Sequence, residues 1–416
     1  MALELLKEFF HDLNAHRTRA FLTLLAITWG TVAVVLLLSF GEGLGNQMMA
    51  GLLNAGNRIM ILYGGETGMQ FEGQPKGRRI RLVEQDVEVL KSAIPAISMI
   101  SPQYRNGVRL TYKKFTINTE CEGVNPMFEE MRRMYPAAGG RFLNEEDVRL
   151  QRRVLVLGAD IAGEVFGEEN PVGNLMDVDG LPFTVVGIVQ KKIQTSMNNG
   201  PDSRRAIMPY STFRTIYGNE RVNSIVLRPV DPALQVVVKK EIFRVLARKY
   251  HFHPDDERTL FIWDFIENEK MSRKIGIGMS IFLFSVGFMT LLIAGVGVAN
   301  VMYVVVKERT HEIGIRMAVG APRRVILAQV IFESLLLAFL GGGIGMMLSW
   351  LVITGVRMIP QESGGMGAMQ FLGRPVLSVF TMMVTAGILA LIGLVAGFFP
   401  ARRAASVDPV ESLRYE

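Results

Sequence analysis

Residues 275–306 read IGIGMSIFLFSVGFMTLLIAGVGVANVMYVVV, a run without one charged side chain. A helix needs about 20 apolar residues to cross the hydrocarbon core of a bilayer, so this run predicts a transmembrane helix. It is about 12 residues longer than necessary, and at 1.5 Å per residue this adds about 18 Å of helix. We expect the surplus to project outward as a stalk if the inner end is held at Lys307; tilt is the competing explanation.

Three more runs are long and apolar enough to span a membrane, namely residues 20–40, 325–356 and 375–400. The third span alone contains a charge, Glu333, about eight residues from its start. That carboxylate can pair with a basic neighbour, snorkel to the interface or take part in proton transfer. The first span is too long for a signal peptide and lacks a suitable small-residue cleavage site, so we expect it to be retained.

Basic side chains near the ends of the spans predict the orientation. Lys and Arg collect before the first span, between the second and third spans, and after the fourth. Because positively charged flanks stay in the cytoplasm, we expect both termini, the loop 307–324 and the tail 401–416 on that side. The long region 41–274 and the short loop 357–374 are then outside.

The composition excludes several classes of protein. Hydrophobic residues make up 49% of the chain, too many and too unevenly distributed for one soluble domain of this length. The net charge is +6, but the basic residues sit largely beside apolar runs, so nucleic acid is not an expected partner. The single cysteine, Cys121, excludes an intramolecular disulfide and a cysteine-cluster metal site.

The segment 1–19 precedes the first span and has one apolar stripe at helical spacing, with charged residues opposite. This pattern predicts an amphipathic helix that lies on the lipid of the inner leaflet, and packing against a partner protein is the alternative. The stripe consists of Leu3, Leu6, Phe10 and Leu13.

The outside region alternates strand-like and helix-like segments and predicts an α+β domain. We expect an α/β lobe built from both ends of the region, with a β-rich lobe of about residues 140–222 inserted into it. Asp179-Gly180 lies between two strand-like runs and predicts a hairpin turn.

Candidate catalytic patterns in this chain are weak. Gly158, Gly163 and Gly167 do not have the G-x-G-x-x-G spacing of a dinucleotide site, so turn and packing roles are expected. The segment YHFHPDDE, residues 250–257, contains His251, His253, Asp255 and Asp256, but it predicts a solvated turn rather than a metal site. HEIGI begins like a zinc-protease motif, but position 315 is Ile where the second ligand His is required.

The segment KERTHEIGIRMAVGAPRR, residues 307–324, is strongly charged and lies between two long apolar runs. Glu312 and Arg316 are four residues apart, a spacing that favours an ion pair on a helix. Gly320, Ala321 and Pro322 then end the helix. A short, rigid, charged helix held between two membrane helices suits contact with a soluble partner.

Small residues at four-residue spacing predict close approach of membrane helices, with loose packing as the alternative. These residues are Gly341 with Gly345 and Gly393 with Gly397.

Six stretches of the chain carry a common signal. They are the segment 304–345, the tail PARRAASVDPVESLRYE, the opening NAHRTRAFLTLLAITWG, and the internal stretches GGRFLNEEDV, VLVLGADIAGEVFG and DSRRAIMPYSTF. Together they resemble the permeases of the MacB/FtsX-like ABC transporter superfamily. The resemblance therefore covers almost the whole chain.

The resemblance implies a bacterial inner-membrane efflux-type permease with four transmembrane helices and a large periplasmic core domain. It implies a dimer that works with ABC ATPase subunits, and in some members with a periplasmic adaptor and an outer-membrane channel. ATP and Mg²⁺ would bind the ATPase, and this chain would bind no cofactor and would not be an enzyme. MacB-type members carry a fused nucleotide-binding domain, but no G-x-x-x-x-G-K-[ST] occurs here, so a separate ATPase polypeptide is expected.

In this family the charged helix between the second and third spans docks on the ATPase, and the permease acts as a mechanical relay. The residues that the resemblance assigns to coupling are Glu308, Arg309, Glu312, Ile313, Gly314, Arg316, Gly320 and Arg323. Among them, Gly314 is expected at a close contact with the ATPase. The alternative function is FtsX-like signalling, in which the outer domain controls a periplasmic hydrolase or partner without transport.

Overall fold

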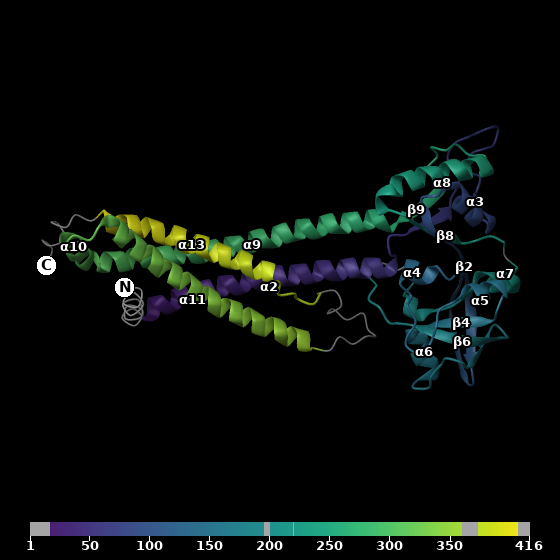
Figure 1. Ribbon diagram of the computed structural model, residues 1–416, viewed down its shortest axis with the longest axis horizontal. Coiled ribbons are helices and arrows are strands. Elements are labelled where there is room, and N and C mark those ends of the chain that lie inside the picture. The colour runs from purple at the N-terminus through teal and green to yellow at the C-terminus, as the bar shows by residue number, and fades with distance from the viewer. Residues whose placement is uncertain (1–16, 195–199, 219, 360–372, 407–416) are drawn as a thin grey trace. The chain divides into compact units, whose positions relative to one another are not determined.

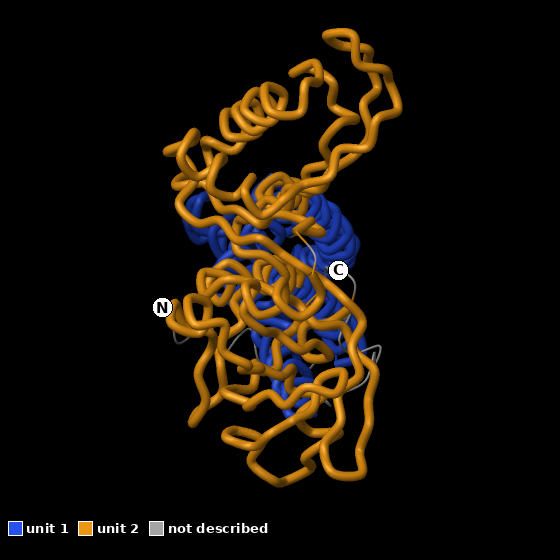
Figure 2. Tube along the Cα trace, turned by 90° about the vertical axis from the view of Figure 1, so that its right-hand side faces the viewer, with its two compact units in different colours: residues 1–47, 274–416 blue, residues 48–273 orange. Residues whose placement is uncertain are grey.

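The computed structural model describes residues 17–194, 200–218, 220–359 and 373–406, and it contains two compact units. One unit is formed by residues 1–47 with 274–416 and the other by residues 48–273 (Figures 1 and 2). The predicted interfacial helix with Leu3, Leu6, Phe10 and Leu13 lies outside the described residues. Most of the C-terminal tail lies outside them as well.

The first unit is helical. Four helices among the described residues are long and apolar enough to cross a membrane, which confirms the expected four-helix membrane fold. They are α2 (Arg17–Ala55), α9 (Phe265–Glu308), α11 (Arg323–Met358) and α13 (Val379–Ala405). Helix α9 begins ten residues before the run at 275, because the polar segment that precedes this run continues the same helix.

Small residues let these helices pack closely. A Cβ atom on Gly341 would lie 2.9 Å from Ile27, and one on Gly345 would lie 2.7 Å from the Thr31 Cβ, so α11 meets α2 here. Gly393 and Gly397 of α13 face α11 in the same way. The hydroxyl of Thr28 donates to the Gly341 carbonyl at 3.1 Å and that of Ser334 donates to Gly393 at 2.8 Å, contacts that a larger residue at either glycine would disturb.

The second unit is built on a mixed β-sheet. Within the described residues its nine strands have the order β3-β7-β4-β6-β5-β2-β8-β1-β9. The strands are β1 (Met60–Gly64), β2 (Ile97–Tyr112), β3 (Phe115–Val124), β4 (Val154–Gly158), β5 (Leu175–Val178), β6 (Leu181–Val189), β7 (Arg205–Pro209), β8 (Ser224–Pro229) and β9 (Leu260–Asp264).

Strand β2 belongs to both halves of this sheet. Its first part, residues 97–103, pairs with β8, and its second part, residues 104–112, pairs with β3. One half therefore contains β1, β8 and β9, and the other contains β3 to β7. The second half begins at residue 104, well before the expected 140–222, because the long β2–β3 hairpin joins it through β7 and β5.

Helices cover the sheet at several points. They are α3 (Gln85–Ala93), α4 (Phe128–Arg132), α5 (Glu145–Arg149), α6 (Ala159–Phe166), α7 (Tyr210–Tyr217) and α8 (Gln235–Tyr250). The expected hairpin at Asp179-Gly180 is confirmed: both residues have positive φ, 50° and 88°, and they join β5 to β6. Buried side chains form two apolar clusters in this unit, one of which includes Tyr104, Phe183 and Phe213.

A network of buried charges lies in the half that contains β3 and β7. The Asp202 carboxylate accepts hydrogen bonds from Arg132 and Gln194, each at 2.8 Å, and Lys192 lies 2.8 Å away. The side chain of Arg205, also buried, donates to Glu122 of β3. Because a buried charge is tolerated only with partners, these contacts hold β3, β7 and the residues Lys192, Gln194 and Asp202 together.

Candidate coupling segment

The charged segment between α9 and α11 folds into one short helix, α10 (Thr310–Ala318). The chain leaves the helix through Gly320, whose φ of 104° is unfavourable for any residue with a Cβ. The amide of Gly320 donates to the Met317 carbonyl at 3.0 Å, and that of Ala321 donates to Arg316 at 2.9 Å, which closes the helix end. Pro322 then stands immediately before α11. The glycine and the proline therefore set the sharp return between the two membrane helices.

One face of α10 packs against the membrane helices. Ile313 and Gly314 are buried, and Ile313 joins the apolar cluster formed by side chains of α2, α9, α11 and α13. The other face is exposed: Glu312 is open to solvent, and Ile315 and Val319 are 42% and 85% exposed. The exposed face thus combines a carboxylate with apolar side chains.

Ion pairs hold the ends of this segment to its neighbours. Glu308 accepts a hydrogen bond from Arg19 of α2 at 2.8 Å. Arg309 donates to the carboxylate of Glu333 on α11 at 3.2 Å, and this carboxylate is almost fully buried. Of the roles left open for Glu333, the structure shows pairing with a basic neighbour.

The prediction of an ion pair between Glu312 and Arg316 is wrong. The guanidinium of Arg316 instead donates to Gln329 of α11 at 2.9 Å, and Gln329 donates to Glu333 at 3.3 Å. The reason is tertiary: α11 folds back beside α10 and offers Arg316 a half-buried acceptor, whereas Glu312 points to solvent. The result is a polar chain that fixes α10 on α11.

The eight residues assigned to coupling therefore occupy different places. Arg309, Ile313, Gly314 and Arg316 face the permease itself, Glu308 pairs with α2, Gly320 forms the turn, and Glu312 and Arg323 are exposed. Two further residues of this segment, the exposed and apolar Ile315 and Val319, are not among the eight. Ile315 and Val319 are four residues apart, so they share one face of a helix, and that face does not include Ile313. This spacing could have identified them from the sequence.

Gly158, Gly167 and Asp256, from the segments considered for a cofactor or a metal, have local structural roles. A Cβ atom on Gly158 would overlap the backbone of residues 202 and 203, and Gly167 has a φ of 60° at the end of α6. The Asp256 carboxylate accepts from the amides of Gly68 and Met69 at 2.6 and 3.0 Å. In the portion of the chain that the structure describes, no three His, Cys, Asp or Glu side chains are grouped to hold a metal.

Comparison with known proteins covers both units. A family model described as the MacB-like periplasmic core domain matches residues 20–244, and one described as the FtsX-like permease C-terminal matches residues 284–409. The resemblance seen in the sequence is thereby confirmed.

Relatives align over the full chain. The macrolide export ATP-binding/permease protein MacB of Bdellovibrio bacteriovorus is 30% identical over 416 residues, which are 100% of this chain and 62% of the relative. The pyoverdine export ATP-binding/permease protein PvdT of Pseudomonas aeruginosa is 30% identical over 415 residues, 99% of this chain and 58% of the relative. The chain thus spans about three fifths of the length of these relatives.

Among solved structures, the periplasmic region of MacB from Actinobacillus actinomycetemcomitans aligns with a TM-score of 0.42 at 22% identity. The alignment covers 53% of this chain and 94% of that one.

Proposed function

The chain belongs to the MacB-like family of ABC transporter permeases, and from that premise we propose that it relays the work of an ATPase to its periplasmic core domain and so drives export of a substrate. The proposal places the chain in a bacterial inner membrane with both termini and α10 in the cytoplasm. The names of the relatives, exporters of a macrolide and of pyoverdine, support export over a signalling role. ATP and Mg²⁺ would bind the ATPase.

The observation that carries the relay is the length of α9. Its 44 residues make a helix of about 66 Å, and β9 ends at Asp264, directly before the helix begins. A layer of about 30 Å, crossed at a tilt of 40°, takes only about 26 residues. Tilt therefore does not account for the full length, and a displacement at Glu308 can reach the core domain through one continuous helix.

The exposed face of α10 is the proposed contact with the ATPase. Glu312 is exposed, has no ion-pair partner among the described residues, and is flanked by the exposed Ile315 and Val319. Such a face offers apolar area that the ATPase can bury, and one charge that would fix the position of the ATPase relative to α10. Gly314 is buried against the permease, so Gly314→Leu would disturb the bundle rather than the contact. Glu312 is therefore the residue to test.

We expect Glu312→Lys to lose the ATPase, because reversing the charge places like charges opposite one another. The measurement is retention of ATP-hydrolysing activity and of an ABC ATPase, seen by mass spectrometry, when the tagged chain is purified from native membranes. Glu168→Lys is the matched control, an exposed charge reversal in the core domain. Both variants should accumulate in the membrane at the wild-type level.

Two results would contradict the proposal. The wild-type chain could retain no ABC ATPase, which would remove the relay itself. Glu312→Lys could retain as much ATPase as the wild-type chain, which would move the contact away from the exposed face of α10. Retention of a cell-wall hydrolase together with the ATPase would favour the signalling role.

A further inference from the structure

Strand β9 forms an open edge of the sheet in the core domain. It comes last in the strand order, and among the described residues it pairs with β1 alone. Strand β3, at the other end of the order, pairs with both β7 and β2. Natural sheets protect their edges with proline, with charged side chains or with a covering segment. The first four residues of β9, LFIW, contain neither a proline nor a charge, so the sequence of β9 leaves this edge unprotected.

The register of β1 and β9 shows which backbone groups of the edge face outward. The Phe265 amide donates to the Ile59 carbonyl at 3.0 Å, and the Gly65 amide donates to the Thr259 carbonyl at 2.9 Å. These two bonds bracket an antiparallel ladder, in which every second residue bonds to the partner strand. The odd-numbered residues of β9 therefore bond to β1. The N–H and C=O groups of its even-numbered residues point away from β1, toward the open edge.

A groove of about 610 Å³ lies along this edge between β9 and α8, which are neighbours in Figure 1. Leu260 and Ile262 line it from β9, and Val236 and Phe243 line it from α8. Leu260 and Ile262 belong to the apolar cluster that includes α8, so Phe261 between them points to the opposite face, where it is 60% exposed. A groove between an edge strand and a helix fits an extended peptide that adds to the sheet.

The charges of the groove differ between its two ends. Near the end of β9, Lys239 is held by Asp264 at 2.7 Å. The next residue, Lys240, lines the groove, is exposed and has no ion-pair partner in the part of the chain that the structure describes. Arg244 pairs with Glu241 of its own helix at 2.9 Å. Two exposed carboxylates line the groove just before β9 begins, and they belong to Asp255 and Glu257.

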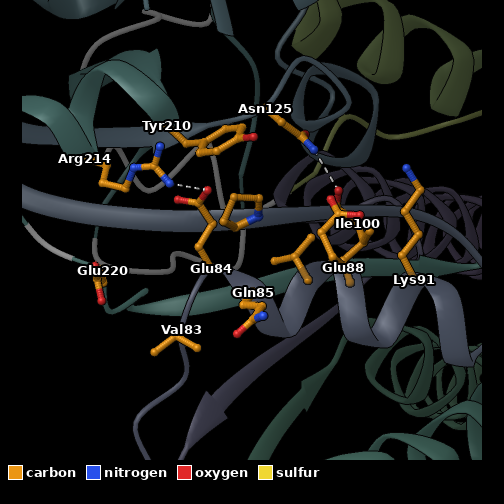
Figure 3. Close-up of a pocket in the computed structure, with 12 residues that line it drawn as sticks. Val83, Glu84, Gln85, Glu88, Lys91, Ile100, Asn125, Tyr210, Arg214 and Glu220 are labelled. Carbon is orange, nitrogen blue, oxygen red and sulfur yellow. Dashed lines mark hydrogen bonds and ion pairs between the residues drawn. The ribbon is translucent and has the colours of Figure 1, made fainter. Parts of the chain in front are cut away.

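A second cavity, of about 490 Å³, lies between α3 and α7 and is shown in Figure 3. Its polar groups contact one another: Arg214 donates to the Glu84 carboxylate at 2.8 Å. The side-chain amide of Asn125 donates to the Ile100 carbonyl, also at 2.8 Å. The edge of β9 differs from this cavity, because its outward backbone groups have no hydrogen-bond partner among the described residues.

We propose that the groove binds an extended polypeptide segment, which adds to β9 as an antiparallel strand and places an acidic side chain beside Lys240. The added strand would bond to the outward N–H and C=O groups of β9, as a neighbouring strand does. Because the two strands run in opposite directions, the acidic residue lies near the N-terminus of the segment. A basic residue near its C-terminus then meets Asp255 and Glu257. The site does not depend on the α10 contact.

The test uses a synthetic peptide of seven residues, in which valine alternates with threonine between an N-terminal glutamate and a C-terminal lysine. The peptide carries BODIPY, an uncharged fluorophore, and binding to the full chain in nanodiscs of zwitterionic lipid is measured by fluorescence anisotropy. We expect saturable binding. Methylation of every second backbone nitrogen blocks the donors on one edge of the peptide. Of two peptides, each methylated on a different edge, only one should bind, because only one edge faces β9.

Lys240→Glu should weaken binding about tenfold, since the reversal removes one exposed ion pair and adds a repulsion. Lys114→Glu is the matched control, an exposed lysine of the core domain that does not line the groove, and it should bind as the wild-type chain does. Equal thermal unfolding of the three chains shows that each one folds.

Three results would overturn the site. The peptide could fail to bind, as it would if a second copy of the chain covered the edge. Both methylated peptides, or neither of them, could bind. Lys240→Glu and Lys114→Glu could bind equally well. Loss of the ATPase by Glu312→Lys is measured separately, so either proposal can fail alone.

Discussion

Gly158→Ala should destabilise the core domain because the added methyl group has no room. Its Cβ would lie 2.3 Å from the Ser203 carbonyl oxygen and 2.6 Å from the Asp202 carbonyl oxygen. Both are backbone atoms, so neither can turn aside as a side chain could. An ordinary contact needs about 3.4 Å or more, so the segment 202–204 must move by about 1 Å.

That movement is opposed by the contacts of the segment. Asp202 holds Arg132 at 2.8 Å, and the Ser203 hydroxyl donates to Asp160 at 2.6 Å. Overpacking of a tightly packed site costs about 1–3 kcal/mol, and the fixed backbone places this substitution near 3 kcal/mol. For a domain of about 200 residues this lowers the melting temperature by about 6–12 °C.

Gly163→Ala is the matched control. Gly163 lies inside α6, five residues away, and a Cβ there meets nothing within 4 Å. We expect a gain of about 0.5–1 kcal/mol, since alanine favours a helix interior. Thermal unfolding of the detergent-purified chain measures the stability of both alanine variants. Trp263 serves as the fluorophore in a chain that carries Trp29→Phe and Trp350→Phe. Equal melting temperatures for the two alanine variants would refute the steric reasoning.

Two further predictions concern charge and topology. Burial, together with the Arg132 and Arg205 guanidinium groups, lowers the pKa of Lys192 from 10.5 to about 8 despite Asp202. The unfolded chain then binds more protons between these values, so the wild-type chain should gain stability relative to Lys192→Met as pH rises from about 8 to 10.5; a constant difference in melting temperature across this range would contradict it. After replacement of Cys121, whose burial raises its thiol pKa, Lys114→Cys should react with an impermeant maleimide in spheroplasts and Ala318→Cys should not; labelling of Ala318→Cys alone would invert the orientation.

Local patterns were a sound guide where a structure depends on a short window of residues. The apolar runs define all four membrane helices, because a bilayer demands about 20 such residues whatever the rest of the chain does. Asp179-Gly180 produces its hairpin for a similar reason, since the turn needs positive φ at both positions. Gly320 and Pro322 likewise end α10 and start α11 as expected.

Contacts between side chains that are far apart in the sequence could not be predicted from local patterns. The helical spacing of Glu312 and Arg316 favoured a local pair, yet Gln329 takes Arg316 because α11 returns beside α10. Arg309 reaches Glu333 across 24 residues for the same reason. Periodicity shows which face of a helix is apolar, but it does not show which polar side chain a neighbouring helix will present.

The membrane class, the number of spans, the α+β character of the core domain and the position of the charged helix were all predictable from the order of the residues. Each of these follows from hydrophobic burial or backbone sterics, which act within one element. The tertiary structure decided that β2 joins both halves of the sheet, that Gly158 abuts the backbone of residues 202 and 203, and that Glu84, Asn125 and Arg214 border one cavity. These features depend on segments that come together only when the chain has folded. The free energy of packing and the free energy of burying a charge both depend on which groups are neighbours in space, and the order of the residues does not give those neighbours.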